Sequence, residues 1–288
     1  GTVNFNLIST VTVSSSPVCF GTPATVTAIP NPAGNYDYSW TVPLGAIDPG
    51  NTPVFTTNIA GDYSVVITDK STTCPSLPGQ GTVIINLVPT VTVSSPPQCL
   101  GTPVTVTALP NPAGVYDYTW TVPVGATDPG NTSNFTTTTA GDYSVIITDK
   151  NTTCPSLPGL GTVIINLMPT VLVTSPVECI GTPATVTALP SPSGVYDYVW
   201  TVPSGVTDPG NVSSFTTTTE GDYSVIISDK ITACPSLPSQ VTVLFNLIPT
   251  VIVSSAPECF GNPATVTAMP NPVGNYDYTW TVPLGAID

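Results

Sequence analysis

The chain has 288 residues, with three lysines, no arginine, no histidine and seventeen acidic residues, and its formal net charge is −14. Three lysines cannot form the cationic surface needed for nucleic-acid phosphates or anionic lipid, and no apolar run approaches the roughly 18 residues of a membrane span. Only 7% of the residues are charged and 41% are hydrophobic, which favours a folded chain over a disordered one.

A period of 80 residues runs through the chain without insertion or deletion. Its markers are Cys19, Cys99, Cys179 and Cys259; Cys74, Cys154 and Cys234; and Trp40, Trp120, Trp200 and Trp280. The period predicts full domains at 9–88, 89–168 and 169–248, the last strand of a preceding repeat at 1–8, and the first half of a further repeat at 249–288. We therefore expect the chain to be a piece of a longer array.

The expected joint between the first two repeats has almost no linker. A β-branched run at 81–87 leads through Val88 and Pro89 directly into the alternating run 90–94. Proline fixes its own φ and restricts the preceding residue to extended backbone. The sequence thus predicts units placed end to end in a stiff rod.

Within the first full repeat the hydrophobic pattern has the period of two that is typical of half-buried strands. The segments 36–42 and 62–68 alternate between small polar and large apolar residues. Turn residues separate the strands at 30–34, 48–51 and 60–62. About seven short strands in 80 residues predict an all-β fold, a tandem array of small β-sandwiches.

The expected core centres on one tryptophan and one tyrosine in each repeat. These residues are Trp40, Trp120, Trp200, Trp280, Tyr63, Tyr143 and Tyr223. Because Tyr36, Tyr38 and Trp40 share one face of one strand, we assign them to the core. The alternative is a set of exposed rings on which sugars stack.

A resemblance to a known family follows from four segments of the first repeat. They are Val18-Cys19-Phe20-Gly21-Thr22-Pro23, Tyr38-Ser39-Trp40, Gly61-Asp62-Tyr63-Ser64-Val65 and a late Cys74. This pattern resembles the PKD-like and Ig-like repeats of giant Bacteroidota cell-surface adhesins, including gliding adhesins exported by the type IX secretion system. Ala60-Gly61-Asp62-Tyr63 is similar to the tyrosine corner of Ig-like folds, although Cys74 comes eleven residues after Tyr63 instead of two. The resemblance covers every repeat and implies Ig-like or PKD-like sandwiches with a role at the cell surface.

The seven cysteines predict disulfides within each unit. We expect the pairs Cys19–Cys74, Cys99–Cys154 and Cys179–Cys234, with the partner of Cys259 outside the chain. Zinc-binding thiolates are the alternative, but the chain has neither CxxC spacing nor histidine. Disulfides persist in oxidising compartments, so the expected location is extracellular or at the cell surface.

No residue is predicted to be catalytic, cofactor-binding or metal-binding. Without histidine, Ser-His-Asp and Cys-His mechanisms are impossible within the chain. The recurrent carboxylates Asp37, Asp48, Asp62 and Asp69 are predicted to be solvated turn formers, with a structural calcium ion as the alternative. Lys70 is predicted to be a surface lysine, with an isopeptide bond to Asn or Asp as the alternative. The threonine-rich segment 135–139 is predicted to be a solvent-facing strand, with O-glycosylation as the alternative.

The uniform repeats predict a structural role and no enzyme activity, because a catalytic unit would differ from its neighbours. We expect the repeat region, the stalk or filament, of a secreted adhesin that carries a binding tip away from the cell. Two alternatives remain, namely a subunit of an extracellular polymeric filament and an accessory glycan-binding array of a secreted enzyme. The expected partners are neighbouring repeats of the same chain. Surface polysaccharide or other cells would be bound through regions outside this chain.

Overall fold

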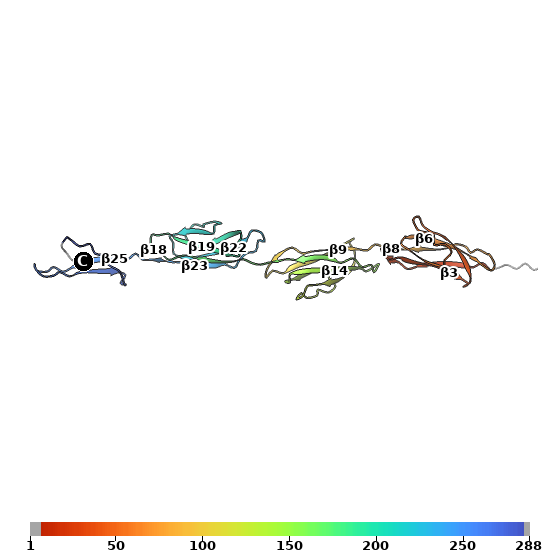
Figure 1. Cartoon of the computed structure of the whole chain (residues 1–288), viewed down its shortest axis with the longest axis horizontal. Coiled ribbons are helices and arrows are strands. Elements are labelled where there is room, and N and C mark those ends of the chain that lie inside the picture. The colour runs from red at the N-terminus through yellow and green to blue at the C-terminus, as the bar shows by residue number, and fades with distance from the viewer. Residues whose placement is uncertain (1–6, 285–288) are drawn as a thin grey trace, which may run out of the picture. The chain divides into compact units, whose positions relative to one another are not determined.

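The computed structural model describes residues 7–284, and the regular secondary structure in this range consists of β-strands (Figure 1). No helix of the described residues is long and apolar enough to cross a bilayer. The chain divides into two compact units, Gly1–Asn166 and Leu167–Asp288. The first unit contains two repeats, and the second contains one repeat and part of the next. Residues 1–6 of the predicted strand at 1–8 lie outside the described residues, as do residues 285–288 of the predicted half repeat.

The first repeat consists of two three-stranded antiparallel sheets and one short parallel pair. Its strands are β1 (Thr10–Ser15), β2 (Val18–Cys19), β3 (Ala24–Asn31), β4 (Tyr36–Thr41), β5 (Val54–Thr57), β6 (Gly61–Asp69), β7 (Gly79–Val83) and β8 (Ile85–Asn86). One sheet has the order β1-β3-β5 and the other β4-β6-β7, while β2 pairs with β8. The two sheets pack face to face around the core, as in Ig-like sandwiches.

The second and third repeats have the same strand order. The second contains β9 (Thr90–Ser94), β10 (Gln98–Cys99), β11 (Val104–Asn111), β12 (Tyr116–Thr121), β13 (Asn134–Thr137), β14 (Gly141–Asp149), β15 (Gly159–Val163) and β16 (Ile165–Asn166). The third contains β17 (Thr170–Thr174), β18 (Glu178–Cys179), β19 (Ala184–Ser191), β20 (Tyr196–Thr201), β21 (Ser214–Thr217), β22 (Gly221–Asp229), β23 (Ser239–Val243) and β24 (Phe245–Asn246). The all-β fold and the tandem Ig-like sandwiches predicted from the alternating pattern are therefore present in the structure.

The core of each full repeat forms around the tryptophan and the tyrosine that the sequence singles out. Trp40, Trp120 and Trp200 are 8%, 7% and 6% exposed, and Tyr63, Tyr143 and Tyr223 are fully buried. In the first repeat the Trp40 ring meets the edge of Phe55 at a centroid distance of 4.9 Å, and Phe55 lies 5.7 Å from Tyr63. The aromatic residues thus link strands of both sheets, since Trp40 and Tyr63 belong to one sheet and Phe55 to the other.

The buried polar groups of these aromatic residues have hydrogen-bond partners. The Trp40 indole N–H donates to the carbonyl of Thr52 at 2.9 Å. The Tyr63 hydroxyl donates to the carbonyl of Ile59, four residues upstream, at 2.9 Å and also contacts the Thr57 hydroxyl at 2.9 Å. This backward bond is the tyrosine corner of Ig-like folds, and it connects β6 to the end of β5.

The fourth repeat departs from the predicted core. β25 (Thr250–Ser255) and β26 (Val266–Asn271) form a two-stranded sheet, and the segment that carries Trp280 forms no strand in the described residues. Trp280 is 37% exposed, so its assignment to a core is wrong. The physical reason is that the strands that cover Trp40 in the first repeat, β5 and β6, have no counterpart beside Trp280 in residues 7–284.

Two glycines allow β7 to lie against β1. A Cβ atom on Gly81 would come within 2.6 Å of the Val13 carbonyl oxygen, and one on Gly79 would collide with the backbone of Val11. In the third repeat Ser239 and Val241 occupy the equivalent positions. There Val173 is buried and Val171 is only partly buried, whereas in the first repeat Val11 is buried and Val13 partly buried. The first strand therefore packs differently where the glycines are absent.

We expect Gly81→Ala to destabilise the first repeat by about 1–3 kcal/mol, because the new methyl group meets a backbone carbonyl and the strand has to move. Urea unfolding followed by tryptophan fluorescence should show part of the signal changing at lower urea. Gln80→Ala, at an exposed position of the same strand, is the matched control and should leave the curve unchanged. Equal curves for the two variants would show that β1 and β7 are not in close contact.

Candidate functional site

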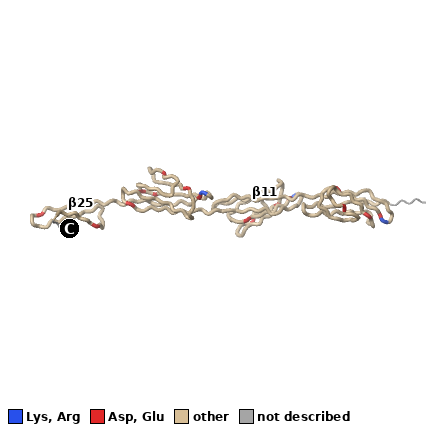
Figure 2. The backbone as a smooth tube through the Cα atoms, turned by 45° about the horizontal axis from the view of Figure 1, so that its top comes forward, with Lys and Arg blue, Asp and Glu red and all other residues tan. Residues whose placement is uncertain are grey.

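A cluster of one aspartate, one asparagine and one lysine recurs in each full repeat. In the first repeat the Lys70 ammonium lies 3.1 Å from the Asp37 carboxylate, and the Asn51 side chain donates to the same oxygen at 2.6 Å. The side-chain amide oxygen Oδ1 of Asn51 accepts the N–H of Tyr38 at 2.8 Å. The equivalent residues are Asp117, Asn131 and Lys150 in the second repeat and Asp197, Asn211 and Lys230 in the third. In Figure 2 lysine is coloured blue and the acidic residues are red.

The cluster connects two strands of the sheet β4-β6-β7, which we call the second sheet, with the loop that leads to β5. Asp37 lies on β4, Lys70 directly follows β6, and Asn51 lies in the loop between β4 and β5. The hydrogen bond from Asn51 and the neighbouring Lys70 lower the pKa of Asp37. Sequence reasoning missed Asn51, although its recurrence as Asn131 and Asn211 after a Pro-Gly turn was a visible signal.

The solvent exposure of Lys70 bears on the isopeptide alternative. Condensation of lysine with asparagine needs a neutral amine held away from water, but the side chains of Lys70 and Asp37 are 44% and 52% exposed. Neither of the two side chains is held away from water. The arrangement is that of a surface ion pair.

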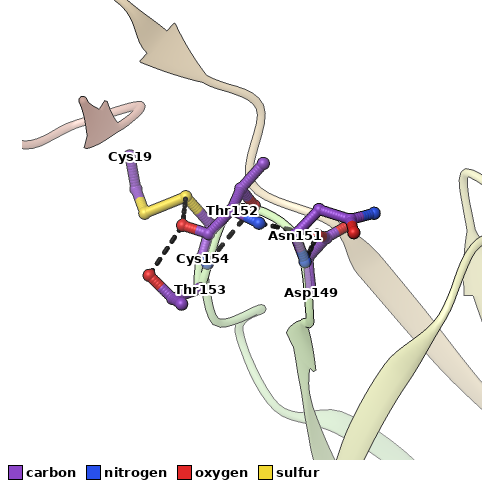
Figure 3. Close-up of a disulfide and its surroundings, with 6 residues drawn as sticks. All are labelled: Cys19, Asp149, Asn151, Thr152, Thr153 and Cys154. Carbon is purple, nitrogen blue, oxygen red and sulfur yellow. Dashed lines mark hydrogen bonds between the residues drawn. A yellow bond between two sulfur atoms is a disulfide. The ribbon is translucent and has the colours of Figure 1, made fainter.

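A second recurrent carboxylate organises the loop that carries the late cysteine. The Asp149 carboxylate accepts the N–H groups of Asn151 at 2.7 Å and Thr152 at 2.9 Å (Figure 3). The Asp149 carbonyl accepts the N–H of Thr153, and the Asp149 N–H donates to the carbonyl of Cys154. These bonds hold Thr153 at φ +60° and place Cys154 in a closed turn directly after β14. The backbone bonds from Thr152 and Asn151 lower the pKa of Asp149.

The lowered pKa values predict acid sensitivity. The carboxylates concerned are Asp37, Asp69, Asp117, Asp149, Asp197 and Asp229. A carboxyl group whose pKa is lower in the folded chain contributes stability that is present above its unfolded pKa, about 3.9, and is lost as the pH falls through its folded pKa.

We expect the thermal midpoint to be nearly constant from about pH 5 to 8 and to fall below about pH 4. Asp149→Asn keeps acceptors for the loop bonds but removes the titrating group, so this variant should lose less stability than the parent on acidification. Calorimetry across this pH range measures both chains. A midpoint that rises as the pH falls below 4 would contradict the assignment.

The structure corrects the predicted disulfides. Cys19 is bonded to Cys154 of the following repeat, 135 residues away, with the two Cα atoms 5.5 Å apart. The predicted pairs Cys19–Cys74 and Cys99–Cys154 are therefore wrong. The predicted pair Cys179–Cys234 is wrong as well, because Cys179 has a free and exposed thiol, as does Cys259.

The reason for the error lies in the direction of β6. Cys19 pairs with Asn86 next to β7, and β7 meets β6 at Gly61, the first residue of that strand. Cys74 follows the last residue of the same strand, Asp69, whose N–H donates to the Cys74 carbonyl. Nine residues of strand separate the two ends by roughly 26 Å, whereas a disulfide requires Cα atoms within about 7 Å. Each repeat thus has its two cysteines at opposite ends.

A tryptic map under non-reducing conditions tests the pairing directly. The chain has lysines only at 70, 150 and 230 and no arginine, so trypsin yields four fragments. After free thiols have been blocked, we expect fragment 1–70 to be linked to fragment 151–230 through Cys19 and Cys154. A link from 1–70 to 71–150 would instead pair Cys19 with Cys74 or Cys99 and would contradict the structure.

The remaining recurrent carboxylates have local partners. Asp48 accepts the N–H of Gly50 at 2.9 Å, and Asp62 accepts the hydroxyl of Thr82 at 2.6 Å. Among residues 7–284, no three His, Cys, Asp or Glu side chains gather in a group that could hold a metal ion.

A shallow threonine-lined hollow recurs beside the tyrosine corner. In the second repeat Thr136 to Thr139 line it together with Pro103, Gly125 and Thr127, and the first and third repeats have equivalent hollows. Thr137 contacts the Tyr143 hydroxyl, and the Thr139 carbonyl accepts its proton. This part of the threonine-rich segment supports the core.

Comparisons with known proteins give only distant similarities. No protein-family model and no curated protein matches the chain. Among solved structures, the chain is similar to Sidekick-1 immunoglobulin domains 1–5 (13% identity, TM-score 0.31) and to the eight N-terminal Ig domains of Down Syndrome Cell Adhesion Molecule (13%, 0.29). It is also similar to the Ig1–Ig3 ectodomain of mouse nectin-like molecule 4 (12%, 0.35). The matches cover 84%, 91% and 80% of this chain, and 60%, 44% and 96% of the three structures in turn.

Proposed function

We propose that this chain is a structural segment of an extracellular adhesin, in which tandem Ig-like repeats form a stalk that carries a binding region away from the cell surface. The observation that carries the proposal is the uniformity of the three full repeats. Each has the same strand order, the same buried aromatic residues and the same Asp-Asn-Lys cluster. Repeats that serve to add length need only to fold and to join their neighbours.

The disulfide between two repeats supports this role. It joins the first repeat to the second, beside the three residues between Asn86 and Thr90 that connect them. A disulfide of this kind persists in an oxidising compartment, which supports an extracellular location. The expected short joint between the repeats supports the proposed stiffness of the stalk and the domain limits at 88/89 and 168/169.

The pattern of cysteine, tryptophan and tyrosine supports an origin among the repeats of Bacteroidota surface adhesins, of the gliding-adhesin type. On this proposal adhesion and anchoring belong to other parts of the parent protein, and this chain is not an enzyme. Its partners are the neighbouring repeats of the same chain.

The alternative of a glycan-binding array requires aromatic rings in register on the surface. The recurrent aromatic residues Tyr36 and Trp40 are buried, and Tyr38 is partly buried. The exposed Phe20 is replaced by Leu100 and Ile180 in the next repeats. The positions that recur on the surface are therefore not aromatic, which favours the stalk.

Two measurements on the parent organism and the purified chain test the proposal. An antibody against the chain should label intact, non-permeabilised cells, and the chain itself should show no saturable binding to a panel of purified surface polysaccharides. Labelling restricted to permeabilised cells would rule out the surface location. Saturable polysaccharide binding that is lost on substitution of exposed residues would replace the stalk by the glycan-binding array.

A further inference from the structure

Because of the disulfide between Cys19 and Cys154, a force that pulls the two ends of the chain apart acts on only some strands of the first two repeats. Cys19 lies ten residues after the start of the first repeat, at the end of β2, and Cys154 lies near the end of the second, before β15. The bond closes a loop that contains β3 to β8 of the first repeat and β9 to β14 of the second. Only β1 and β2 lie before the loop, and only β15 and β16 lie after it within these repeats.

We propose that this disulfide is a covalent clamp that carries tension from one repeat to the next and keeps the central strands of both sandwiches out of the load path. A force applied along the chain enters through β1, crosses the two sulfur atoms and leaves through β15. The strands with the buried Trp40, Tyr63, Trp120 and Tyr143 lie inside the closed loop. Tension therefore cannot extend them while the bond is intact.

The position of the clamp fits this role. Cys19 pairs with Asn86, and the N–H of Phe20 donates to the Asn86 carbonyl at 2.8 Å, so the cysteine is held beside the last strand of its repeat. On the other side, the N–H of Lys150 donates to the Val115 carbonyl at 3.1 Å, and the Asp149 carboxylate holds the turn that ends in Cys154. Each sulfur is thus anchored on a hydrogen-bonded part of its own sandwich, and Figure 3 shows the turn on the Cys154 side.

The clamp runs parallel to the peptide connection between the repeats. The main chain passes from β8 to β9 through Leu87, Val88 and Pro89, and the disulfide spans the same boundary. A single short peptide still allows rotation about its free dihedrals, whereas two connections restrict that rotation. The clamp goes beyond the proposed stalk function, because it is argued from the disulfide alone. It also fits that function, because a stalk under tension would need such a bond.

Single-molecule stretching of the full chain tests the clamp. Azide-bearing residues at the exposed positions Ile8 and Leu167 serve as handles, and the chain is held in urea so that its contour length is measured without folded structure. Without reductant the contour between the handles should be about 80 Å, because the 135-residue loop is bypassed. A dithiol then passes two electrons and two protons to Cys19 and Cys154, becomes a disulfide itself, and should lengthen the contour by about 450–490 Å.

Two variants make the result specific. Cys19→Ser should have the long contour with and without reductant, because it cannot form the bond. Cys179→Ser is the matched control, since Cys179 occupies the equivalent strand of the third repeat with a free thiol, and it should behave like the parent. A gain of only about 190 Å on reduction would indicate Cys19–Cys74 instead, and no gain would show that the loop is not closed. Either result would overturn the clamp but leave the surface-labelling test of the stalk unaffected.

Discussion

The central strand of the second sheet, β6 in the first repeat, is the element on which the rest of each sandwich depends. It pairs with β4 on one side and β7 on the other, and its inward residues Tyr63, Val65 and Ile67 are buried. The Tyr63 hydroxyl connects it to the end of β5 in the opposite sheet. Because the strand is nine residues long, it also sets the distance between the two ends of the repeat. The core and the positions of the cysteines therefore follow from the same strand.

Polar residues at the ends of these strands hold the loops outside the core in position. The Asp-Asn-Lys cluster joins β4, the end of β6 and the loop after β4, while Asp149 shapes the turn that presents Cys154. Both arrangements are exposed, so each one contributes little stability by itself. Their effect is geometric, because they hold the loops in the positions that the buried strands define. The bond between two repeats requires this placement, since a disulfide forms only over a narrow range of distances.

The variation among the repeats shows which features the fold tolerates. Gly79 and Gly81 in the first repeat correspond to Ser239 and Val241 in the third, where the first strand buries a different valine. The strand order and the aromatic core nevertheless stay the same. The edge between β1 and β7 therefore varies among the full repeats, whereas the aromatic centre is the same in all three. A repeat that can absorb such changes at its edge is suited to being copied many times in one chain.

The sequence alone determined the period, the all-β fold and the inward tyrosines and tryptophans of the three full repeats. These properties are local, because alternation and turn residues report the face on which each side chain lies. The partners of the cysteines were not predictable in this way. Cys19 and Cys74 are close in sequence and belong to one repeat, yet β6 places them at opposite ends of the sandwich, and Cys19 meets Cys154 instead. The exposure of Trp280 was missed for a related reason, since its burial requires covering strands, and the described part of the fourth repeat has none beside it. Only the tertiary structure decided these points, because a disulfide and a buried ring depend on which elements meet in space. In a periodic sequence the equivalent cysteines recur in each repeat, so the sequence does not show which of them are bonded to each other.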